Sequence, residues 1–411
     1  MRIGMISQWY EPETGSAAHP TAIARALTAR GHDVQVLTGF PSYPQGRVHS
    51  GYRMAPRRHE VRDGVQLLRV PDVPSHDDNA LRRAASLTSF AASATLQVGW
   101  LRHVDVCLVY LTPATVGAAA MALRATAGVP YVLYVQDLWP ETVTASGFIG
   151  NRRASDAAER GITAFLTRLY GRAEGIAAIS PTMARTIAER GPRVSPESIP
   201  NWVDETVFRP APPVVDPALA PDRSWIMYAG GVGEVQALEH AVRAVALLGN
   251  RPDIGLAIVG DGVARPGLEE LAARLGVSDR VRFLGPRPMA DMPGLMAASV
   301  AQLVSLRDLE LFRGTIPSKV QASMACASPV LCSVAGDAAA LVERVRCGVT
   351  VAPEDAQELA AGMRTLVDLP LPERQEMGAR GRAAYERELG SAAGAEHLER
   401  MLLAAARSRH R

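Results

Sequence analysis

The sequence predicts an α/β protein made of two Rossmann-like, doubly wound domains. Short apolar runs rich in β-branched residues alternate with longer amphipathic runs, which is typical of parallel strands covered by helices on both faces. One Pro-rich stretch at 209–221 interrupts the alternation, which then begins again, so this stretch is interpreted as a linker. The chain has 411 residues, enough for two domains of about 200 residues each.

Each half of the chain supplies six strand-like runs. In the first half the expected strands are 2–7, 33–40, 65–71, 104–110, 131–137 and 175–180, and the helices are 17–31, 80–101, 113–128, 151–173 and 182–191. In the second half the strands are 225–231, 254–260, 281–285, 300–306, 329–334 and 349–351, with helices at 237–249, 265–276, 289–298, 317–327, 338–347 and 355–368. The tail, 372–390 and 391–408, is helical. We therefore expect domains over 1–205 and 206–390, with ligands at the carboxyl ends of the strands, in the cleft between them.

The composition excludes several classes of protein. Hydrophobic residues make up 47% and charged residues 21%, which is ordinary for a globular protein, and a net charge of +2 without a basic tract argues against nucleic-acid binding. The four cysteines lack CxxC spacing and are expected to be buried thiols in a reducing compartment. No HxH, HExxH or Asp-x-Asp motif suggests a metal site.

The apolar stretches are too short for targeting or membrane spanning. Residues 1–7 form a strand-like run, not a signal peptide, and the runs at 91–101 and 114–123 fall short of the roughly 20 residues that a membrane span needs. We expect a cytoplasmic protein that at most rests on the inner face of a membrane.

An anion site is expected where the stretch 314–319 leads into a helix. Pro317 is expected at the first helical position, with Ser318 and Lys319 in the first turn and Arg313 just upstream. Free N–H groups and the helix dipole favour an anion there, and Lys319 and Arg313 supply positive charge. An ordinary capped helix with exposed charges is the alternative.

Glycine-rich loops follow three other strands. Gly15 and Ser16 open the first helix, so that backbone approaches a ligand closely. In the second half, Gly231 and Gly233 follow one strand, and Gly260 and Gly262 follow the next. These glycines expose N–H groups to an anion or merely turn the chain, and none completes a GxGxxG motif.

The loop after the fifth strand, 136–141, contains a carboxylate pair and a Trp. Asp137 is placed to orient a hydroxyl group or to accept its proton, and Trp139 to shape a sugar-sized pocket. Alternatively, Asp137 caps a helix and Trp139 belongs to the core. Asp204, at the end of the first half, is expected to make an Asx turn.

Together these motifs resemble those of the GT-B glycosyltransferases, specifically the retaining family 4, and the resemblance covers almost the whole chain. Within that family, the chain is similar to bacterial transferases that add amino- or deoxy-sugars to surface polysaccharides. The resemblance depends on the order and strand-end placement of six motifs: Glu-Pro-Glu-Thr-Gly at 11–15, Gln-Asp-Leu-Trp-Pro-Glu at 136–141, Pro-Asn-x-Val-Asp at 200–204, Tyr-Ala-Gly-x-x-Gly at 228–233, Gly-Asp-Gly at 260–262 and Ile-Pro-Ser-Lys at 316–319.

The resemblance implies a metal-independent transferase with no cofactor, which moves a sugar from a nucleotide sugar to an acceptor with retention. The second domain would hold the nucleotide and the first the acceptor, and the last helix, about 391–411, would cross back to the first domain. Gly15 and Ser16 would approach the donor, Arg313 and Lys319 would neutralise its pyrophosphate, and Asp137 would face the acceptor or the sugar.

The chain departs from the family pattern around the ribose. A Glu usually stands three residues after the Lys, where this chain has Ala322, and Ala327 replaces a Gly. Glu234 lies near the position of a basic residue, and Gln136 replaces a frequent His. Either the ribose contacts Gln321 or Asp337 instead, or the substrates, including the donor, are unusual.

Several functions stay open. The acceptor is a lipid-linked glycan or a soluble small molecule, including a thiol, and the donor is of the UDP or GDP type. A nucleotide-sugar 2-epimerase and a non-catalytic nucleotide-sugar-binding relative share the architecture. A lipid-linked acceptor would suit membrane contact by the helix 80–101, whose alternative is packing on the first sheet.

Overall fold

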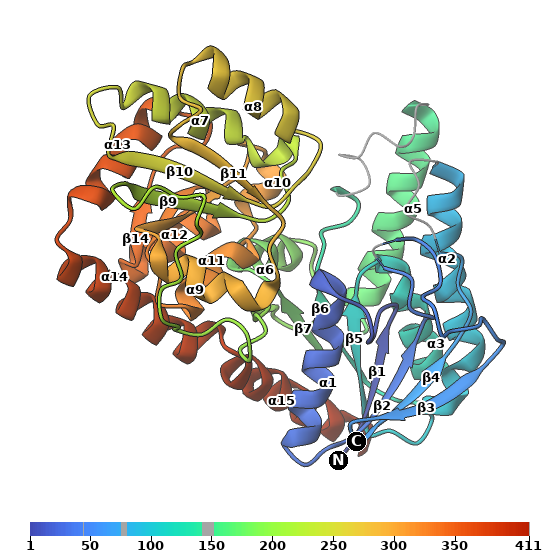
Figure 1. Cartoon of the computed structure of the whole chain (residues 1–411). Helices are drawn as coiled ribbons and strands as arrows, with labels where there is room; N and C mark the ends of the chain where they lie inside the picture. Colours follow the sequence, from blue (N-terminus) through green and yellow to red (C-terminus); the bar gives the residue numbers. More distant parts are fainter. Residues whose placement is uncertain (44, 75–79, 142–151, 411) are drawn as a thin grey trace. The chain divides into compact units, whose positions relative to one another are not determined.

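The computed structural model describes residues 1–43, 45–74, 80–141 and 152–410, and the chain forms two compact units (Figure 1). Unit 1 contains Met1–Pro200 and Gly394–Arg411, and unit 2 contains Asn201–Ala393. Each unit is built around one parallel or almost parallel sheet with helices on both faces. The predicted fold class is confirmed.

Unit 1 contains an eight-stranded sheet in the order β3-β4-β2-β1-β5-β6-β7-β8. Its central strands are buried on both faces, which explains their nearly continuous apolar sequences. All neighbours are parallel except β3 and β4. The strands are β1 (Arg2–Ser7), β2 (Asp33–Thr38), β3 (Arg58–Arg62), β4 (Val65–Arg69), β5 (Val106–Leu111), β6 (Tyr131–Val135), β7 (Gly175–Ala178) and β8 (Glu197–Ser198).

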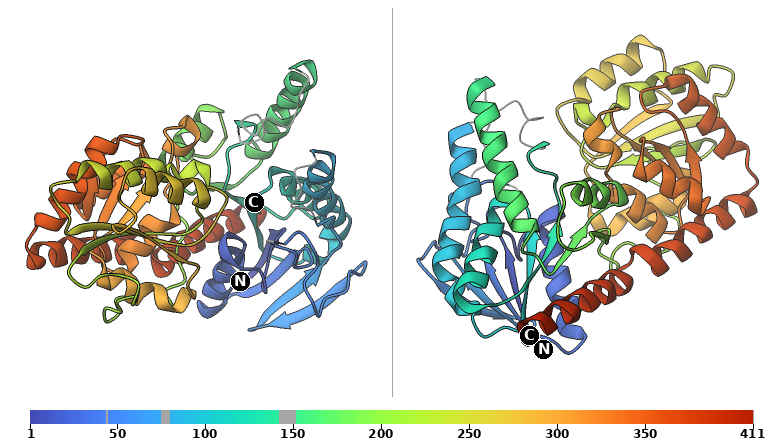
Figure 2. Two further views of the ribbon diagram at one scale, coloured as in Figure 1. Left: turned by 45° about the horizontal axis from the view of Figure 1, so that its top comes forward. Right: turned by 180° about the vertical axis from the view of Figure 1, so that it is seen from behind.

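The helices of unit 1 cover the sheet in two layers. Figures 1 and 2 show α2, α3 and α5 side by side over one face, where Phe90, Ala120 and Leu169 join the core. On α15, Glu399 pairs with Arg30 and His32 at the end of α1, so the last helix belongs to this unit from Gly394 onward. The helices are α1 (His19–Ala29), α2 (Ala80–Gln97), α3 (Gly117–Ala127), α5 (Arg152–Tyr170), α6 (Pro181–Glu189) and α15 (Ser391–Arg407), with 3-10 turns η1 (Gly15–Ala18), η2 (Val98–Leu101) and η3 (Ala114–Val116).

Unit 2 contains a six-stranded, fully parallel sheet in the order β11-β10-β9-β12-β13-β14. This is the doubly wound order in which the strand succession reverses between the first strand, β9, and the fourth, β12. In doubly wound sheets, ligands bind outside the carboxyl ends of the strands at such a reversal. The strands are β9 (Ser224–Ala229), β10 (Ile254–Val259), β11 (Val281–Gly285), β12 (Ala301–Ser305), β13 (Val330–Ser333) and β14 (Gly348–Thr350).

Helices enclose a hydrophobic core on each face of the second sheet. Those with side chains in one core are α7 (Leu238–Leu247), α8 (Arg265–Arg274) and α13 (Ala356–Asp368). Those on the other side are α9 (Met292–Ala298), α11 (Ser318–Ala325), α12 (Asp337–Val345) and α14 (Leu371–Ala384), which continues into a π-helical turn at Tyr385–Leu389. Two short 3-10 turns, η4 (Glu234–Gln236) and η5 (Met289–Asp291), precede α7 and α9.

Three elements were not expected from the sequence: β3, β8 and the four-residue helix α10 (Glu310–Arg313). β3 forms an antiparallel hairpin with β4 through Asp63 and Gly64, both with positive φ. An Asp-Gly turn is a hairpin signal, but the flanking strand Arg58–Arg62 is too charged to register as an apolar run. A partly exposed edge strand tolerates such a sequence because only one of its edges is paired.

The interpretation of 209–221 as a linker was wrong, because this segment packs on unit 2. The N–H of Val214 donates to the carbonyl oxygen of Gly294 at 2.9 Å, and a Cβ at Gly294 would lie 2.8 Å from the Val214 side chain. Asp216 accepts two hydrogen bonds from the guanidinium of Arg287, at 2.7 and 3.1 Å. The chain passes between the units near Pro200 and again near Ala393.

The Asx turn at Asp204 is confirmed, since its Oδ1 accepts from the N–H of Thr206 at 3.0 Å.

Ala327, which replaces the glycine of the family pattern, has a left-handed backbone with φ of 54°. This conformation costs an L-residue about 1–2 kcal/mol, whereas the greater freedom of unfolded glycine costs roughly 0.5–1 kcal/mol. We expect Ala327→Gly to raise the free energy of unfolding by about 0.5–1 kcal/mol in denaturant titrations. Ala361→Gly, at an exposed position inside α13, is the matched control and should lose about 1 kcal/mol. Equal losses in both variants would refute the strain at Ala327.

Candidate functional site

The side chain of Lys319 lies at the switch point of the second sheet. Its Nζ would be 3.0 Å from a Cβ at Gly230, which directly follows β9, and 5.1 Å from the ring centroid of Tyr228. Lys319 itself follows β12, in the first turn of α11. The ammonium group of α11 therefore lies against the glycine-rich turn after β9, at the edge of the sheet where ligands bind in doubly wound folds.

Nothing in the described part of the chain neutralises Lys319. No carboxylate there lies within 4.0 Å of its Nζ, although the side chain is half-buried. Burial lowers the pKa of the ammonium group because desolvation disfavours the charged form. Lys319 is also the only lysine in the whole sequence, so every other cationic side chain apart from histidine is an arginine. A desolvated cation without a counter-ion fits a site for an anion.

The start of α11 adds further positive potential. The helix begins at Ser318, so Pro317 is the N-cap and not the first helical residue as predicted, while Ser318 and Lys319 do lie in the first turn. No side chain caps this end, and the first N–H groups of a helix have no partner within it. The α11 N-terminus and the Lys319 ammonium group can therefore bind the same anion.

The glycine loops have a steric role besides the one predicted. A Cβ at Gly260 would overlap the carbonyl group of Gly230, and a Cβ at Gly262 would overlap that of Val232. The N–H groups of Gly230 and Gly260 donate to backbone carbonyls, that of Gly262 to the Asp261 side chain, and that of Gly233 to Gln236 Oε1 at 2.9 Å. Among the predicted glycines of unit 2, only Gly231 has an N–H without a hydrogen bond to the described residues. The absence of Cβ atoms thus lets the two loops pack directly against each other, and Gly231 presents one N–H.

Arg313, at the end of α10, is held by Asp308. Its Nε and Nη2 donate to the two carboxylate oxygens of Asp308, each at 3.0 Å. The side chain of Arg313 is 56% exposed, so the pair lies near the surface. The backbone of Arg313 touches Gly336, where φ is 84° and no Cβ fits, so the loops after β12 and β13 pack together.

The two predicted ribose contacts, Gln321 and Asp337, also belong to unit 2. Gln321, one turn into α11, is only 3% exposed, and its amide makes no hydrogen bond to the described residues. Ala322 is buried beside it. Asp337 is the first residue of α12 and directly follows Gly336.

In unit 1, Asp137 lies just after β6 in a half-buried position. Its Oδ2 accepts a hydrogen bond of 2.6 Å from the hydroxyl of Thr112, which follows the neighbouring strand β5. Burial raises the pKa of this carboxyl group, and no cation in the described residues lies within 4.0 Å of it. Trp139 packs against the core, and its carbonyl oxygen accepts from Arg190 at 2.6 Å.

The loop after β1 is anchored by Glu13. This carboxylate is 4% exposed and accepts from the N–H groups of Ser42, at 2.8 Å, and Tyr43, at 3.0 Å. Gly15 follows with φ of 63° and begins η1, which includes Ser16. The structure thus places the predicted pair, Gly15 and Ser16, at the carboxyl end of β1, on a fixed loop.

Sequence reasoning missed a buried polar pair in unit 1, Gln8 and Asp72. Gln8 follows β1 and Asp72 follows β4, and Gln8 Nε2 donates to Asp72 Oδ2 at 3.4 Å. Burial, together with the nearby negative charge of Glu13, raises the pKa of Asp72 to about 6. The available signal was their position at strand ends, which the two residues share with Asp137.

The raised pKa of Asp72 predicts a pH-dependent effect of Asp72→Asn. Ionised Asp72 destabilises the folded state, a cost that is complete above the folded pKa of about 6 and disappears below the ordinary value of 3.8. The variant lacks this cost, so its stability advantage over the wild type should grow by about 2 kcal/mol from pH 4.5 to pH 8. Denaturant titrations of both proteins at the two pH values measure this difference. An advantage that is constant with pH would contradict the assignment.

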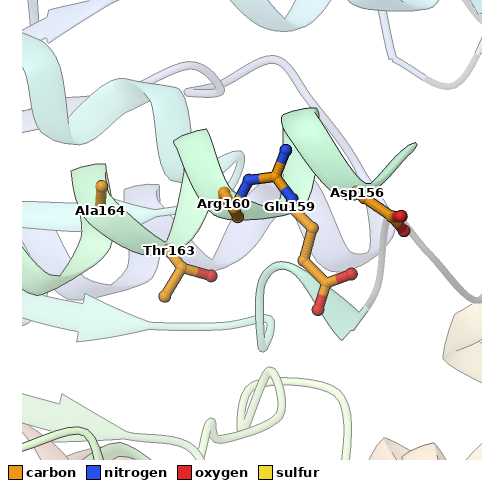
Figure 3. A pocket seen from close by; sticks show the side chains of 5 residues that line it. All are labelled: Asp156, Glu159, Arg160, Thr163 and Ala164. Atoms are coloured by element: carbon orange, nitrogen blue, oxygen red, sulfur yellow. The ribbon is translucent and has the colours of Figure 1, made fainter. Parts of the chain in front are cut away.

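An open hollow also lies along α5, lined by Asp156, Glu159, Arg160, Thr163 and Ala164 (Figure 3). All five side chains come from one helix, and none belongs to a strand-end loop. It therefore contains none of the residues predicted for binding or catalysis.

Within the residues that the structure describes, no helix is both long enough and apolar enough to cross a membrane. On α2, Phe90 and Ala94 are fully buried in the core and Leu96 is 82% exposed. Packing on the first sheet accounts for most of the described apolar face of this helix.

Comparisons with known proteins match both halves of the chain. A family model described as "Glycosyl transferase 4-like domain" matches residues 14–202, and one described as "Glycosyl transferases group 1" matches residues 223–368. The colanic acid biosynthesis glycosyl transferase WcaI of Escherichia coli (strain K12) is 27% identical over 88% of this chain and 91% of its own. A GDP-mannose-dependent alpha-mannosyltransferase of Mycolicibacterium smegmatis is 27% identical over 92% of this chain and 91% of its own.

Solved structures match the whole architecture. HepE of Anabaena, in complex with UDP and glucose, has a TM-score of 0.65 and 18% identity and covers 98% of this chain and 99% of its own. Sucrose-phosphate synthase of Thermosynechococcus elongatus has a TM-score of 0.70 and 19% identity with the same coverage. At this identity the likeness shows the fold.

Proposed function

We propose that this chain, which belongs to glycosyltransferase family 4 and has the GT-B fold, transfers its sugar with retention of the anomeric configuration and without a metal ion. It is a glycosyltransferase, and the donor of the sugar is a nucleotide sugar. In this proposal, unit 2 binds the nucleotide sugar and unit 1 binds the acceptor.

The observation that carries the proposal is the ammonium group of Lys319 at the switch point of unit 2, which forms no ion pair with any described residue. Breaking the bond between sugar and pyrophosphate develops negative charge on the leaving phosphate oxygens. A fixed cation in a partly desolvated site stabilises that charge more strongly than water does. The N–H group of Gly231 and the first turn of α11, including Ser318, lie in the same region to receive phosphate oxygens.

Arg313 is proposed as the second phosphate ligand. Its pair with Asp308 is exposed, and exposed pairs of this kind contribute only about 0–1 kcal/mol, so a diphosphate competes with it readily. Arg313 would then have an anionic partner in both states, the Asp308 carboxylate in the free protein and a phosphate oxygen when the diphosphate is bound.

The nucleoside is proposed to contact α11 and α12 in place of the absent glutamate. Gln321 offers a buried amide with no partner among the described residues, and Asp337 offers a carboxylate at the first turn of α12. Gly260 and Gly262 let the loop after β10 pack against the backbone of the loop after β9, and the proposal places the nucleotide beside these two loops. In unit 1, Gly15 and Ser16 would approach the transferred sugar.

Asp137 is proposed to orient the acceptor hydroxyl group. In a retaining transfer of this kind, the leaving pyrophosphate takes the proton of the acceptor on the same face of the sugar. The protein then supplies charge stabilisation and positioning, and it needs no nucleophile of its own. Asp137, fixed by Thr112 and without a cation among the described residues, is available to accept a hydrogen bond.

Donor and acceptor class are proposed from the relatives. One relative is named GDP-mannose-dependent and one neighbour was solved with UDP and glucose, which supports a UDP- or GDP-sugar. The colanic acid transferase supports a glycan acceptor, lipid-linked or free. The location proposed for such an enzyme is the cytoplasm, with peripheral contact at the membrane.

The test starts with a thermal-shift screen of UDP-, GDP- and dTDP-sugars, since a donor that binds only the folded protein raises its melting temperature. Transfer with the selected donor is then followed by NMR, which reports the anomeric configuration of the new bond. Retention, and equal rates after EDTA treatment, are expected. An inverted product or loss of turnover with EDTA would overturn the mechanism, and a sugar altered without any acceptor would indicate an epimerase.

A further inference from the structure

Glu354 lies in the loop after β14 and has a left-handed backbone, with φ of 60°. This conformation costs an L-residue about 1–2 kcal/mol, which is why glycine or asparagine usually occupies such positions. Strained residues other than glycine persist where the surrounding structure holds them in place, and they cluster at functional sites. The contacts of the Glu354 carboxylate therefore have to account for a glutamate at this position.

The Glu354 carboxylate binds the loop after β12 through both of its oxygens. Oε1 accepts a hydrogen bond of 2.9 Å from Arg307 Nη1, and Oε2 accepts one of 2.9 Å from the N–H of Asp308. The strand order is β12-β13-β14, so this contact reaches across the end of β13. Ser333, the last residue of β13, supports the crossing, because its hydroxyl donates to the carbonyl oxygen of Ala352 at 3.4 Å.

Arg307 extends the connection to the segment that follows β9. Its Nη2 donates to Glu239 Oε1 at 2.9 Å, and its backbone N–H donates to the carbonyl oxygen of Val235 at 2.9 Å. Glu239 lies in the first turn of α7, and Val235 lies in η4, directly after the glycine-rich loop. A guanidinium group that donates to two carboxylates is fixed in direction as well as in position. The loop after β12 is thus held from both sides in the sheet order, by the loop after β14 and by the segment after β9.

The loop after β12 also leads to the second phosphate ligand proposed above. The two carboxylate oxygens of Asp308 accept from Nε and Nη2 of Arg313, each at 3.0 Å, and α10 follows at once, from Glu310 to Arg313. Any displacement of Asp308 therefore moves the guanidinium group of Arg313. A cation that is not held in place binds an anion more weakly, because binding must then also order its side chain.

We propose that Glu354 is a positioning residue, which holds Asp308, and through it Arg313, where Arg313 binds the diphosphate of the donor. The carboxylate of Glu354 would repel a diphosphate, so it acts through Arg313 and is not itself a ligand. The effect on donor binding rests on the proposed function, whereas the tether between Glu354 and Asp308 does not.

Hydrogen exchange of the full chain without ligand, followed by mass spectrometry, tests the tether. Glu354→Gly removes the carboxylate and relieves the left-handed backbone, so this variant should stay folded. The peptide that contains Asp308 should exchange at least about tenfold faster, because the N–H of Asp308 loses its acceptor. Unchanged exchange of this peptide would overturn the tether.

Glu358→Ala is the matched control for this experiment. The carboxylate of Glu358 comes from the same region and accepts from the N–H of Ala352 at 2.7 Å, but it has no hydrogen bond to the loop after β12 among the described residues. The variant should speed exchange around Ala352 and leave the peptide that contains Asp308 as slow as in the wild type. Faster exchange of both peptides in Glu358→Ala would show general loosening and overturn the specific tether.

Steady-state kinetics separates positioning from a merely structural role. Glu354→Gly should raise the KM for the nucleotide sugar about tenfold, equal to about 1.4 kcal/mol, and change kcat less than about twofold. Loss of folded enzyme would instead lower the apparent kcat and leave the KM unchanged. Glu354→Gln should recover part of the KM, because its amide oxygen still accepts a hydrogen bond from Arg307 or Asp308.

A double variant shows whether Glu354 acts through Arg313. Arg313→Ala should raise the KM by itself, and adding Glu354→Gly should raise it no further, since the guanidinium group that Glu354 positions is already absent. Additive increases, or a wild-type KM in Glu354→Gly beside a raised KM in Arg313→Ala, would overturn the proposal. If exchange is faster in Glu354→Gly but neither variant changes the KM, the tether stands, and the phosphate role of Arg313 in the proposed function fails.

Discussion

Lys319→Ala should lower kcat/KM for sugar transfer by about a thousandfold, or about 4 kcal/mol of transition-state stabilisation. The variant removes a half-buried ammonium group that has no carboxylate within 4.0 Å in the described residues and lies against the Gly230 turn. No other lysine exists in the chain to replace it. Steady-state kinetics with the donor selected by thermal shift measures the effect.

The fold should survive this substitution. Lys319 contacts glycine backbone and the Tyr228 ring and takes part in no ion pair of the described structure, so its loss removes a desolvated charge. The melting temperature without ligand should therefore stay close to that of the wild type. Lys319→Arg is the matched variant, because it keeps the charge and changes the geometry, and it should recover part of the rate. Transfer by Lys319→Ala at the wild-type rate would show that this lysine does not bind the leaving group.

The single lysine permits a direct measurement on the same site. Reductive methylation with ¹³C-formaldehyde labels only Lys319 and the N-terminal amine, so one side-chain resonance is observed. Its titration should give a pKa below the ordinary 10.5, since burial is the largest influence. Binding of the nucleoside diphosphate should raise that pKa, because a nearby anion stabilises the ammonium form.

Asp137→Asn should lower kcat by about a hundredfold and leave nucleotide binding unchanged. Asparagine keeps the shape of the side chain and can still accept from Thr112, but it removes the charge that would orient an acceptor hydroxyl group. The increase in melting temperature on donor binding should match that of the wild type, because Asp137 belongs to unit 1 and the proposed nucleotide site to unit 2. Kinetics and thermal shift on the same protein measure the two quantities separately.

Thr112→Val is the control for Asp137. It removes the hydrogen bond of 2.6 Å and keeps the carboxylate, so it should lower the rate less than Asp137→Asn does. Unchanged kinetics in Asp137→Asn would reduce this residue to a structural role, and loss of the nucleotide response would move it to the donor site.

Much of the fold was predictable because it is local in sequence. Alternation of buried strands with amphipathic helices identifies both sheets, and the first strand of each half, β1 and β9, begins within one residue of its predicted start. Strand β3 was missed because its charged sequence is stabilised only by pairing with β4. The segment 209–221 looked like a linker because proline breaks any periodic pattern, although Asp216 and Val214 fix it to unit 2.

The sequence by itself determined that a helix begins after a strand of the second domain, with Arg313 just before it and Lys319, the only lysine, in its first turn. Tertiary structure decided what surrounds them. It placed Lys319 against Gly230, and this contact exists because β9 and β12 are neighbours in the sheet. It also paired Arg313 with Asp308. It also brought Gln8 and Asp72 together from positions 64 residues apart. Local pattern fixes which residues follow a strand, but the order of strands in the sheet fixes which of those residues meet, and that order depends on contacts distant in the chain.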